Sequence, residues 1–241
     1  MNSYSGNGDS GKGGKRGRLM WLLFLGIAAS LTIGSCASLP NFRWIKESIV
    51  VIESEGLGAG IAITKDGYIL TNNHVVSNGP MTVHYFYGPK VRTTPGRFVY
   101  GWPEGDIAVV KVEVPLYPAR FGDSDTIKVG DTVYTYGHPY GIAWSCTKGI
   151  VSAIRYTEIG QKIFQHDAMI GPGNSGGILA NEAGNVIGIN FAGEAMRMGL
   201  FHQPIMLGVN YALSGNLAYN AAMLVINIDR ELECGKELLE R

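Results

Sequence analysis

The sequence predicts an all-β fold made of two sets of about six short strands, arranged either as paired antiparallel barrels or as a sandwich. Three observations support this fold class. Short apolar runs alternate with turn signals from Ser48 onward. The 34 glycines and 12 tyrosines suit strands joined by tight turns, and 46% of the residues are hydrophobic, which is enough for a sizeable core. A length of 241 residues is common for a single all-β domain.

The first six strands are expected between Ser48 and Glu113. Lys65-Asp66-Gly67 separates two of them and is a strong hairpin turn, because glycine adopts a positive φ without steric cost. The expected strands, in order, are "SIVVIES", "GAGIAIT", "GYILT", "TVHYFYG", "RFVYG" and "IAVVKVE".

A connecting loop, "PLYPARFGDSDTIKVGD", is expected to lead into the second set of strands. The segment from Asn216 to Arg241 has helical periodicity, which predicts one C-terminal helix. The second set of strands, in order, is "TVYTYG", "GIVSAIRY", "KIFQHDAM", "GGILA", "NVIGINFAG" and "LGVNYAL".

Two segments precede this body. Residues 1–18 are basic and rich in Gly and Ser, so they are expected to be disordered. Residues 19–40 are apolar and follow a basic flank, as in an export signal, and "IGSC" resembles a lipobox in which Cys36 becomes the acylated first residue of a lipoprotein. The alternative is an uncleaved anchor, because about 20 apolar residues can span a bilayer. Either arrangement predicts an extracytoplasmic, membrane-tethered protein.

The charge of the body argues against nucleic-acid binding. Residues 1–36 hold four of the 20 basic residues and one of the 20 acidic residues, so the rest of the chain has 16 bases against 19 acids. A body with this balance has no positive field that would attract a polyanion.

The remaining cysteines, Cys146 and Cys234, are expected to be unpaired thiols. They form a disulfide outside the cell only if the fold brings them together, which the sequence does not establish. Neither lies in a sequence that resembles the turn of a cysteine nucleophile.

The stretch "GPGNSGGIL" surrounds one serine, Ser175, with glycines and then enters an apolar run. A serine hydroxyl is a poor nucleophile unless a nearby base takes its proton and an acid orients that base. His74 follows an apolar strand in "ILTNNHVV", and Asp106 precedes another in "EGDIAVVKV", where its carboxylate can be shielded from water. The amides of Gly173 and Ser175 are candidates for an oxyanion hole, because a side chain at Gly173 would obstruct the required peptide orientation.

The order His…Asp…Ser and the wording "TNNHVV", "DIAVVKV" and "GNSGG" resemble the trypsin-fold serine proteases, specifically the HtrA (Do-like) branch. The resemblance runs from about Ile49 to Leu213 and includes "GHPYG" and "GNVIGIN". It implies two six-stranded antiparallel Greek-key barrels, at about 45–118 and 123–215, with the catalytic residues in the cleft between them. The implied protease domain covers residues 41–230, and residues 231–241 form the end of the C-terminal helix.

The resemblance also implies a substrate pocket without an acidic base. The sixth residue before the serine lies at the base of the primary pocket in this fold, and here it is Met169. A small or medium apolar residue before the scissile bond is therefore expected, with the substrate backbone added as a strand. The implied pocket and strand residues are Met169, Ile170, Phe191, Ala192, Gly193 and Gly208, although residues 194–206 differ from the usual family segment.

We therefore predict a serine endopeptidase acting on polypeptides, with His74, Asp106 and Ser175 as its catalytic residues. The chemistry needs no cofactor or metal. The other histidines do not have metal-ligand spacing and are interpreted as surface or turn residues; they are His84, His138, His166 and His202. In the family, aromatic residues before the first barrel help to build a trimer, which makes Phe42 and Trp44 candidates for a homotrimer contact.

The alternative function is a catalytically idle barrel that binds peptides or scaffolds an envelope complex. The PDZ module of some family members is not seen here, so its functions are not transferred.

Overall fold

The computed structural model describes residues 42–77, 79–197 and 204–239, all within one compact unit. The predictions for residues 1–18, for the apolar segment 19–40 and for Cys36 lie outside these ranges, as does His202. No helix among the described residues has the length and apolar character needed to cross a membrane.

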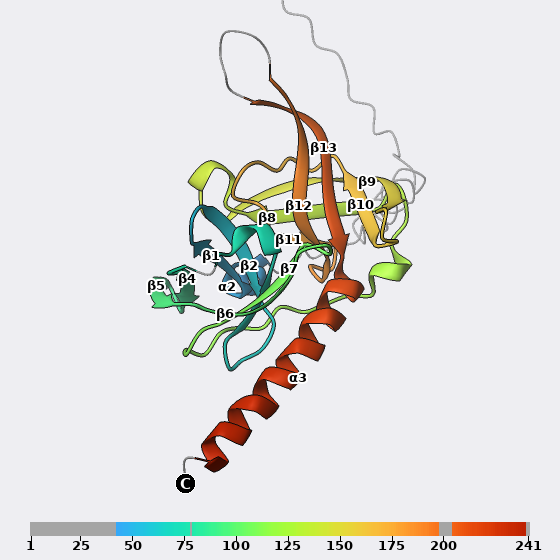
Figure 1. The fold of residues 1–241 in the computed structure, drawn as a ribbon. Helices are drawn as coiled ribbons and strands as arrows, with labels where there is room; N and C mark the ends of the chain where they lie inside the picture. Colours follow the sequence, from blue (N-terminus) through green and yellow to red (C-terminus); the bar gives the residue numbers. More distant parts are fainter. Residues whose placement is uncertain (1–41, 78, 198–203, 240–241) are drawn as a thin grey trace, which may run out of the picture. The chain divides into compact units, whose positions relative to one another are not determined.

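The fold is mainly β and ends in one long helix, as the sequence predicts (Figure 1). The first half contains α2 (Phe42–Ser48), β1 (Ile49–Glu53), β2 (Leu57–Ala62), β3 (Tyr68–Thr71), η1 (Asn73–Val75), β4 (Thr82–Tyr87), β5 (Lys90–Pro95), β6 (Arg97–Trp102) and β7 (Ile107–Lys111). The second half contains η2 (Ser124–Thr126), β8 (Thr132–Gly137), η3 (Pro139–Gly141), β9 (Ser145–Tyr156), β10 (Lys162–His166), β11 (Ile178–Ala180), β12 (Val186–Arg197), β13 (Pro204–Ser214) and α3 (Gly215–Leu239).

The first sheet has seven strands, in the order β5-β4-β1-β2-β3-β7-β6, rather than the six that were expected. The additional strand is β5, which is mostly exposed and polar and so lacks the apolar alternation that marks its neighbours. By contrast, β3 and β7 are buried along their whole length, because both of their faces are covered. Gly67 has φ +99° in the turn before β3, as the Lys65-Asp66-Gly67 sequence predicts.

The second sheet closes into a six-stranded barrel in the order β10-β13-β12-β11-β8-β9. β12 and β13 run together as a long hairpin, drawn in brown and orange in Figure 1. They extend to Arg197 and Pro204, through residues that the sequence had marked only as an unusual segment. Antiparallel pairing of successive strands in both sheets confirms the predicted all-β class. Of the two expected barrels, the second is closed, whereas the described strands of the first sheet form only a half-barrel.

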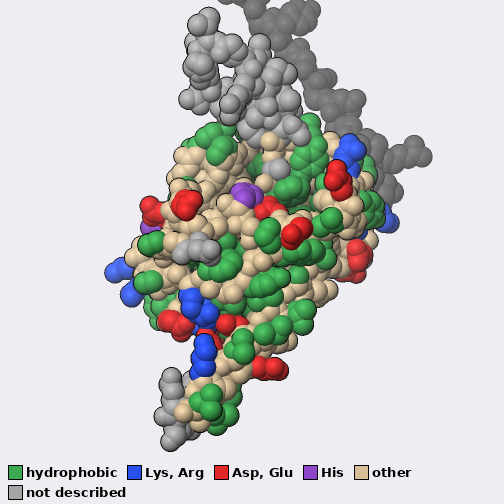
Figure 2. Space-filling model, viewed as in Figure 1, with side chains coloured by type: hydrophobic (Ala, Val, Ile, Leu, Met, Phe, Trp, Pro, Cys, Tyr) green, Lys and Arg blue, Asp and Glu red, His purple; other side chains and the backbone are tan. Residues whose placement is uncertain are grey.

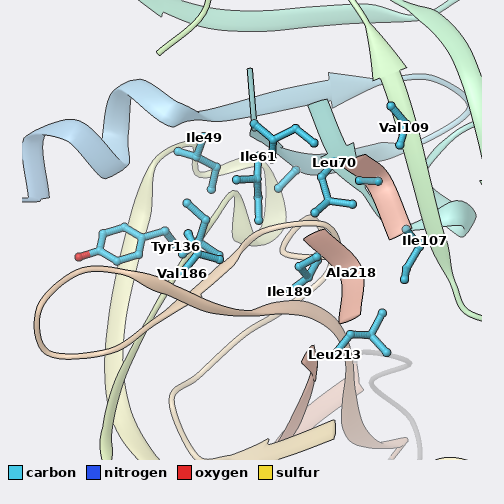
Figure 3. Close-up of a cluster of buried hydrophobic side chains, with 14 of the residues drawn as sticks. Ile49, Ile61, Leu70, Ile107, Val109, Tyr136, Val186, Ile189, Leu213 and Ala218 are labelled. Carbon is cyan, nitrogen blue, oxygen red and sulfur yellow. The ribbon is translucent and has the colours of Figure 1, made fainter. Parts of the chain in front are cut away.

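The main core joins the two sheets and the C-terminal helix (Figure 3). Ile61 and Leu70 come from the first sheet, Ile189 and Leu213 from the barrel, and Ala218 from α3. Each fully buried isoleucine or leucine contributes about 1.5–3 kcal/mol relative to an exposed one. The two β units are therefore held against each other by a continuous apolar layer.

Both helices pack on this body. In α2, Ile45 is fully buried and Trp44 packs against the main core, beneath the Arg120 guanidinium at 5.8 Å. Trp44 thus has contacts within its own chain, whereas the side chain of Phe42 is not among those described. Polar contacts tie α3 to the first sheet: Asp229 accepts hydrogen bonds from Tyr68 at 2.9 Å and from Arg97 at 3.0 Å.

Candidate active site

The structure brings His74 and Asp106 together. His74 lies in the short helix η1 directly after β3, and Asp106 directly precedes β7, the strand that pairs with β3. The Asp106 carboxylate accepts hydrogen bonds from the His74 backbone N–H, at 3.1 Å, and from ring atom Nδ1, at 2.9 Å. With its proton on Nδ1, the ring presents Nε2 as a proton acceptor.

Asp106 has φ +50°, in the left-handed region. This conformation costs a non-glycine residue about 1 kcal/mol, although aspartate tolerates it better than most residues. The backbone N–H of Asp106 donates to Pro103 O at 3.2 Å, which closes the turn. The carboxylate is only partly shielded: 26% of the Asp106 side chain and 50% of the His74 side chain are exposed.

Ser175 lies on a tight loop between β10 and β11. Gly173 has φ +100°, and a Cβ there would lie 2.3 Å from His138 O, so the loop requires glycine at this position. Ser175 O accepts from the Ala59 N–H at 2.8 Å, which ties the loop to the first sheet. Ser175 Oγ donates to Phe191 O at 3.5 Å and makes no hydrogen bond with any other described residue, His74 included.

The loop also presents two free amides. Pro172 O accepts from the Tyr140 N–H at 2.7 Å, and because the peptide bond is trans, the N–H of Gly173 points away from Tyr140. Within the described ranges, the N–H groups of Gly173 and Ser175 donate no hydrogen bond. Both amides are therefore available to an external acceptor.

One cavity of about 260 Å³ is lined by His74, Ser175 and Gly173 together. Leu57 and Val75 supply part of an apolar wall, and this wall belongs to the first sheet, whereas the serine loop belongs to the second. The predicted base, nucleophile and amide donor thus share one hollow where the two β units meet.

A larger cavity, of about 510 Å³, lies between α3 and strands β6 and β7 and contains none of the predicted site residues. Its lining is mainly apolar and includes Leu224, Ile228 and Leu232, and hydrophobic side chains are visible along the helix in Figure 2. It offers neither a serine nor a histidine, so the smaller cavity is the better candidate for chemistry.

The predicted specificity residues occupy different settings. Met169 is 64% exposed and its carbonyl accepts from Thr147 Oγ1 at 2.6 Å, whereas Ile170 is buried. In the β12–β13 hairpin, Gly193 pairs with Asn210 and not with Gly208. Gly208, at φ +71°, lies in the bulge of that hairpin, and a Cβ there would meet nothing within 4 Å.

Asn210 was not among the residues that the sequence singled out. It is 1% exposed, lies opposite Gly193 and donates from Nδ2 to Ala168 O at 2.9 Å. No motif marks it, because its place opposite Gly193 depends on the register of a bulged hairpin. Phe191 and Ala192 lie on the same strand, and Ala192 pairs with Tyr211.

Two histidines are buried, which corrects their interpretation as surface or turn residues. His138 and His166 are both fully inaccessible to solvent. His138 donates from Nε2 to Val50 O at 3.0 Å and accepts at Nδ1 from the Trp144 N–H at 2.9 Å, so its ring is neutral. Burial lowers the pKa of each ring to about 4, because desolvation disfavours the charged form.

These histidines predict a loss of stability in mild acid. An unfolded histidine titrates near pH 6.5, so between about pH 6.5 and 4 the unfolded chain binds protons that the folded chain does not. The contribution of these two neutral histidines to the free energy of unfolding is therefore complete above about pH 6.5. It falls as the pH decreases toward 4, by up to about 3 kcal/mol for each histidine. Urea unfolding at pH 7 and pH 4.5 measures this. The His166→Gln variant is expected to lose less stability between these pH values than the wild type, and equal losses would contradict the assignment.

Other candidate chemistry finds no support in the described part of the chain. Cys146 and Cys234 are free thiols, as the sequence predicts, and both are exposed. No group of three or more histidine, cysteine or acidic side chains in these ranges is placed to hold a metal ion. His84 is partly exposed on β4 of the first sheet, and its Nε2 forms a hydrogen bond with the Glu53 carboxylate at 3.1 Å.

The sequence matches a peptidase family model and is similar to named serine endoproteases. A family model described as a trypsin-like peptidase domain matches residues 58–189. A probable periplasmic serine endoprotease DegP-like from Pseudomonas putida (strain GB-1) is 39% identical over 171 residues, which cover 66% of this chain and 34% of the relative. The periplasmic serine endoprotease DegP of Escherichia coli (strain K12) is 36% identical over 176 residues, covering 68% of this chain and 34% of that protein. The chain spans about a third of the length of these curated relatives.

Solved structures give the same result. The HtrA-type protease AlgW with a tripeptide has a TM-score of 0.66 and 30% identity, covering 78% of this chain and 64% of that one. The serine endoprotease from Yersinia pestis has a TM-score of 0.64 and 30% identity, covering 77% of this chain and 65% of that one.

Proposed function

Because the chain belongs to the trypsin-like peptidase family, and within it to the HtrA branch, we propose that it is a serine endopeptidase that hydrolyses polypeptides. One observation carries the proposal. The His74 ring, held at 2.9 Å by the Asp106 carboxylate, lines the same cavity as Ser175 and Gly173. The peptides bound in the AlgW structures are consistent with polypeptide substrates.

In the proposed mechanism, Ser175 Oγ attacks the substrate carbonyl carbon while His74 Nε2 takes the hydroxyl proton. His74 then gives that proton to the leaving amine, which breaks the peptide bond and leaves an acyl-enzyme. Water, activated by the same ring, hydrolyses the acyl-enzyme. Among the described residues, Ser175 Oγ makes one hydrogen bond, the 3.5 Å contact with Phe191 O, so the hydroxyl is free to turn toward the His74 ring that lines the same cavity.

Asp106 and the serine loop stabilise the charges that develop. The carboxylate keeps the His74 proton on Nδ1 and stabilises the imidazolium that forms during attack. The free N–H groups of Gly173 and Ser175 form the oxyanion hole, where each donor contributes about 10²–10³-fold to the rate. The Tyr140–Pro172 hydrogen bond supports this role, because it sets the direction of the Gly173 N–H.

The proposed primary pocket accepts a small or medium apolar residue before the scissile bond. Its expected base carries Met169 and Ile170, neither of which is acidic, so a preference for Lys or Arg is not expected. Asn210 joins Gly193 as a wall residue in this proposal, in place of Gly208. Phe191, Ala192 and Gly193 provide the strand that pairs with the substrate backbone.

An extracytoplasmic location is part of the proposal. The curated relatives are named as periplasmic, and the basic and apolar amino-terminal segments are typical of an exported, tethered chain. Mass spectrometry of the mature amino terminus separates the two forms of tether: a diacylated Cys36 indicates a lipoprotein, and an intact apolar segment indicates an anchor helix.

A peptide library and a fluorophosphonate probe test the function together. The wild type is expected to cleave after small or medium apolar residues and to be labelled by the probe, and His74→Ala is expected to abolish both reactions. The second candidate, a catalytically idle peptide-binding barrel, rests on the unusual hairpin beyond Gly193. Peptide binding without cleavage or labelling would favour that candidate and reject the endopeptidase.

A further inference from the structure

Asn72 is a buried polar residue to which the mechanism above gives no role. It lies between β3 and η1, two positions before His74, and its side chain is fully inaccessible to solvent. It occupies the N-cap position of η1, where asparagine commonly caps the helix with its side chain. Here the side chain makes no capping hydrogen bond. Its polar atoms are used elsewhere.

The Asn72 amide joins two distant segments. Oδ1 accepts from the Gly176 N–H at 2.6 Å, and Nδ2 donates to Asp106 O at 2.9 Å. Gly176 directly follows Ser175, so one bond reaches the serine loop in the second β unit, and the other reaches the turn in the first sheet that carries Asp106. The orientation of the amide follows from its partners, because a backbone N–H only donates and a carbonyl only accepts.

We propose that Asn72 is a positioning residue that sets the separation of the nucleophile, the base and the orienting acid. The three groups lie on separate segments, and this side chain contacts two of those segments while its own backbone leads into the third. It also holds the carbonyl of Asp106, whose backbone is in the left-handed conformation. This inference rests on the proposed endopeptidase function.

A buried asparagine that only stabilised the fold would have a different signature. The Gly176 N–H has a second acceptor, Asn190 O at 2.8 Å, so the loop keeps a hydrogen bond when Asn72 is removed. Asp106 keeps its bonds to His74 and to Pro103 O. Loss of the Asn72 bridge therefore leaves each segment folded. The serine loop is still tied to β2 by the Ala59–Ser175 bond, but the direct link between this loop and the turn that carries Asp106 is lost, so their separation is less strictly fixed.

The experiment compares Asn72→Ala with the wild type on one peptide substrate. The variant is expected to have kcat about 10²-fold lower, because a displacement of about 1 Å between reacting groups costs about that much. KM is expected to stay within about 3-fold, because Asn72 does not line the candidate cavity. The concentration of active sites is determined by titration with the fluorophosphonate, and kcat is calculated per titrated site. Unfolded protein is not labelled, so it does not lower the measured kcat.

Asn216→Ala is the matched control. Asn216 is also an asparagine that bridges segments far apart in sequence: Oδ1 accepts from the Ser124 N–H at 3.1 Å and Nδ2 donates to Asp123 at 2.8 Å, away from the candidate site. Its removal is expected to lower Tm and leave kcat unchanged. If Asn72→Ala is recovered unfolded, Asn72→Asp is measured instead. It keeps the acceptor for Gly176 but loses the donor to Asp106 O, and the same fall in kcat is expected.

The outcomes separate the two proposals. A wild type that neither cleaves nor is labelled overturns the endopeptidase function and this inference with it. A wild type that is active, with an Asn72 variant whose kcat per titrated site is unchanged, overturns only the positioning role. An equal fall in kcat and rise in KM would also overturn it, because that pattern indicates general loosening of the binding site.

Discussion

Replacing Ser175 by alanine is expected to lower kcat for peptide hydrolysis by about 10⁶-fold. The variant has no hydroxyl to form the acyl-enzyme, so only substrate binding and the amides of Gly173 and Ser175 continue to assist attack by water. The fold is expected to be unaffected, because within the described part of the chain Ser175 Oγ makes a single hydrogen bond, at 3.5 Å to Phe191 O. The loss therefore reports chemistry and not unfolding.

The measurement is single-turnover cleavage of an unfolded polypeptide, with Tm recorded for each variant. Ser152→Ala is the matched control, because Ser152 is an exposed serine on β9, outside the candidate cavity. It is expected to cleave at the parental rate. A Ser175→Ala variant that also cleaved at that rate would remove the basis for the endopeptidase assignment.

The second large effect is expected for Asp106→Asn, which should lower kcat by about 10⁴-fold near pH 7. Asparagine has nearly the same shape as aspartate and tolerates the left-handed conformation that Asp106 adopts at φ +50°, so the turn is expected to persist. An amide nitrogen facing His74 Nδ1 would favour the ring form that carries its proton on Nε2. In that form Nε2 has no lone pair with which to accept the proton of Ser175.

Asp66→Asn provides a control for loss of one carboxylate. Asp66 lies in the hairpin turn before β3 and pairs with Arg230 of α3 at 2.9 Å, with half of its side chain exposed. Exposed ion pairs contribute about 0–1 kcal/mol, so little change in Tm and none in kcat is expected. Comparison of kcat at pH 7 tests the pair of variants. If Asp106→Asn retains more than about a tenth of wild-type activity, the proposed orienting role of Asp106 is wrong.

The local sequence was informative wherever one segment decides the structure by itself. Gly67 takes a positive φ after Asp66, and the predicted C-terminal helix closely matches Gly215–Leu239. The alternating apolar runs indicated most strands for the same reason. The exposed strand β5 was missed because its residues pair with β4 through backbone hydrogen bonds and bury little, so its side chains carry no apolar pattern.

Features that depend on pairing between distant segments were predicted less well. His138 and His166 were expected near the surface, but both are enclosed between segments that are not adjacent in sequence. The residue opposite Gly193 is Asn210 because a bulge shifts the register of β12 and β13. A one-residue change of register reverses which face a side chain occupies, so these assignments require the paired strands.

The sequence by itself determined the fold class and the identity of the three candidate catalytic side chains, because residue type and local motif carry that information. Only the tertiary structure decided how they meet: the His74–Asp106 hydrogen bond, the cavity that His74 shares with Ser175, and the Asn72 bridge between their segments. The physical reason is that hydrogen bonds act over about 3 Å, whereas these residues are separated by 32 to 104 positions along the chain. Packing of the two β units converts that separation into contact.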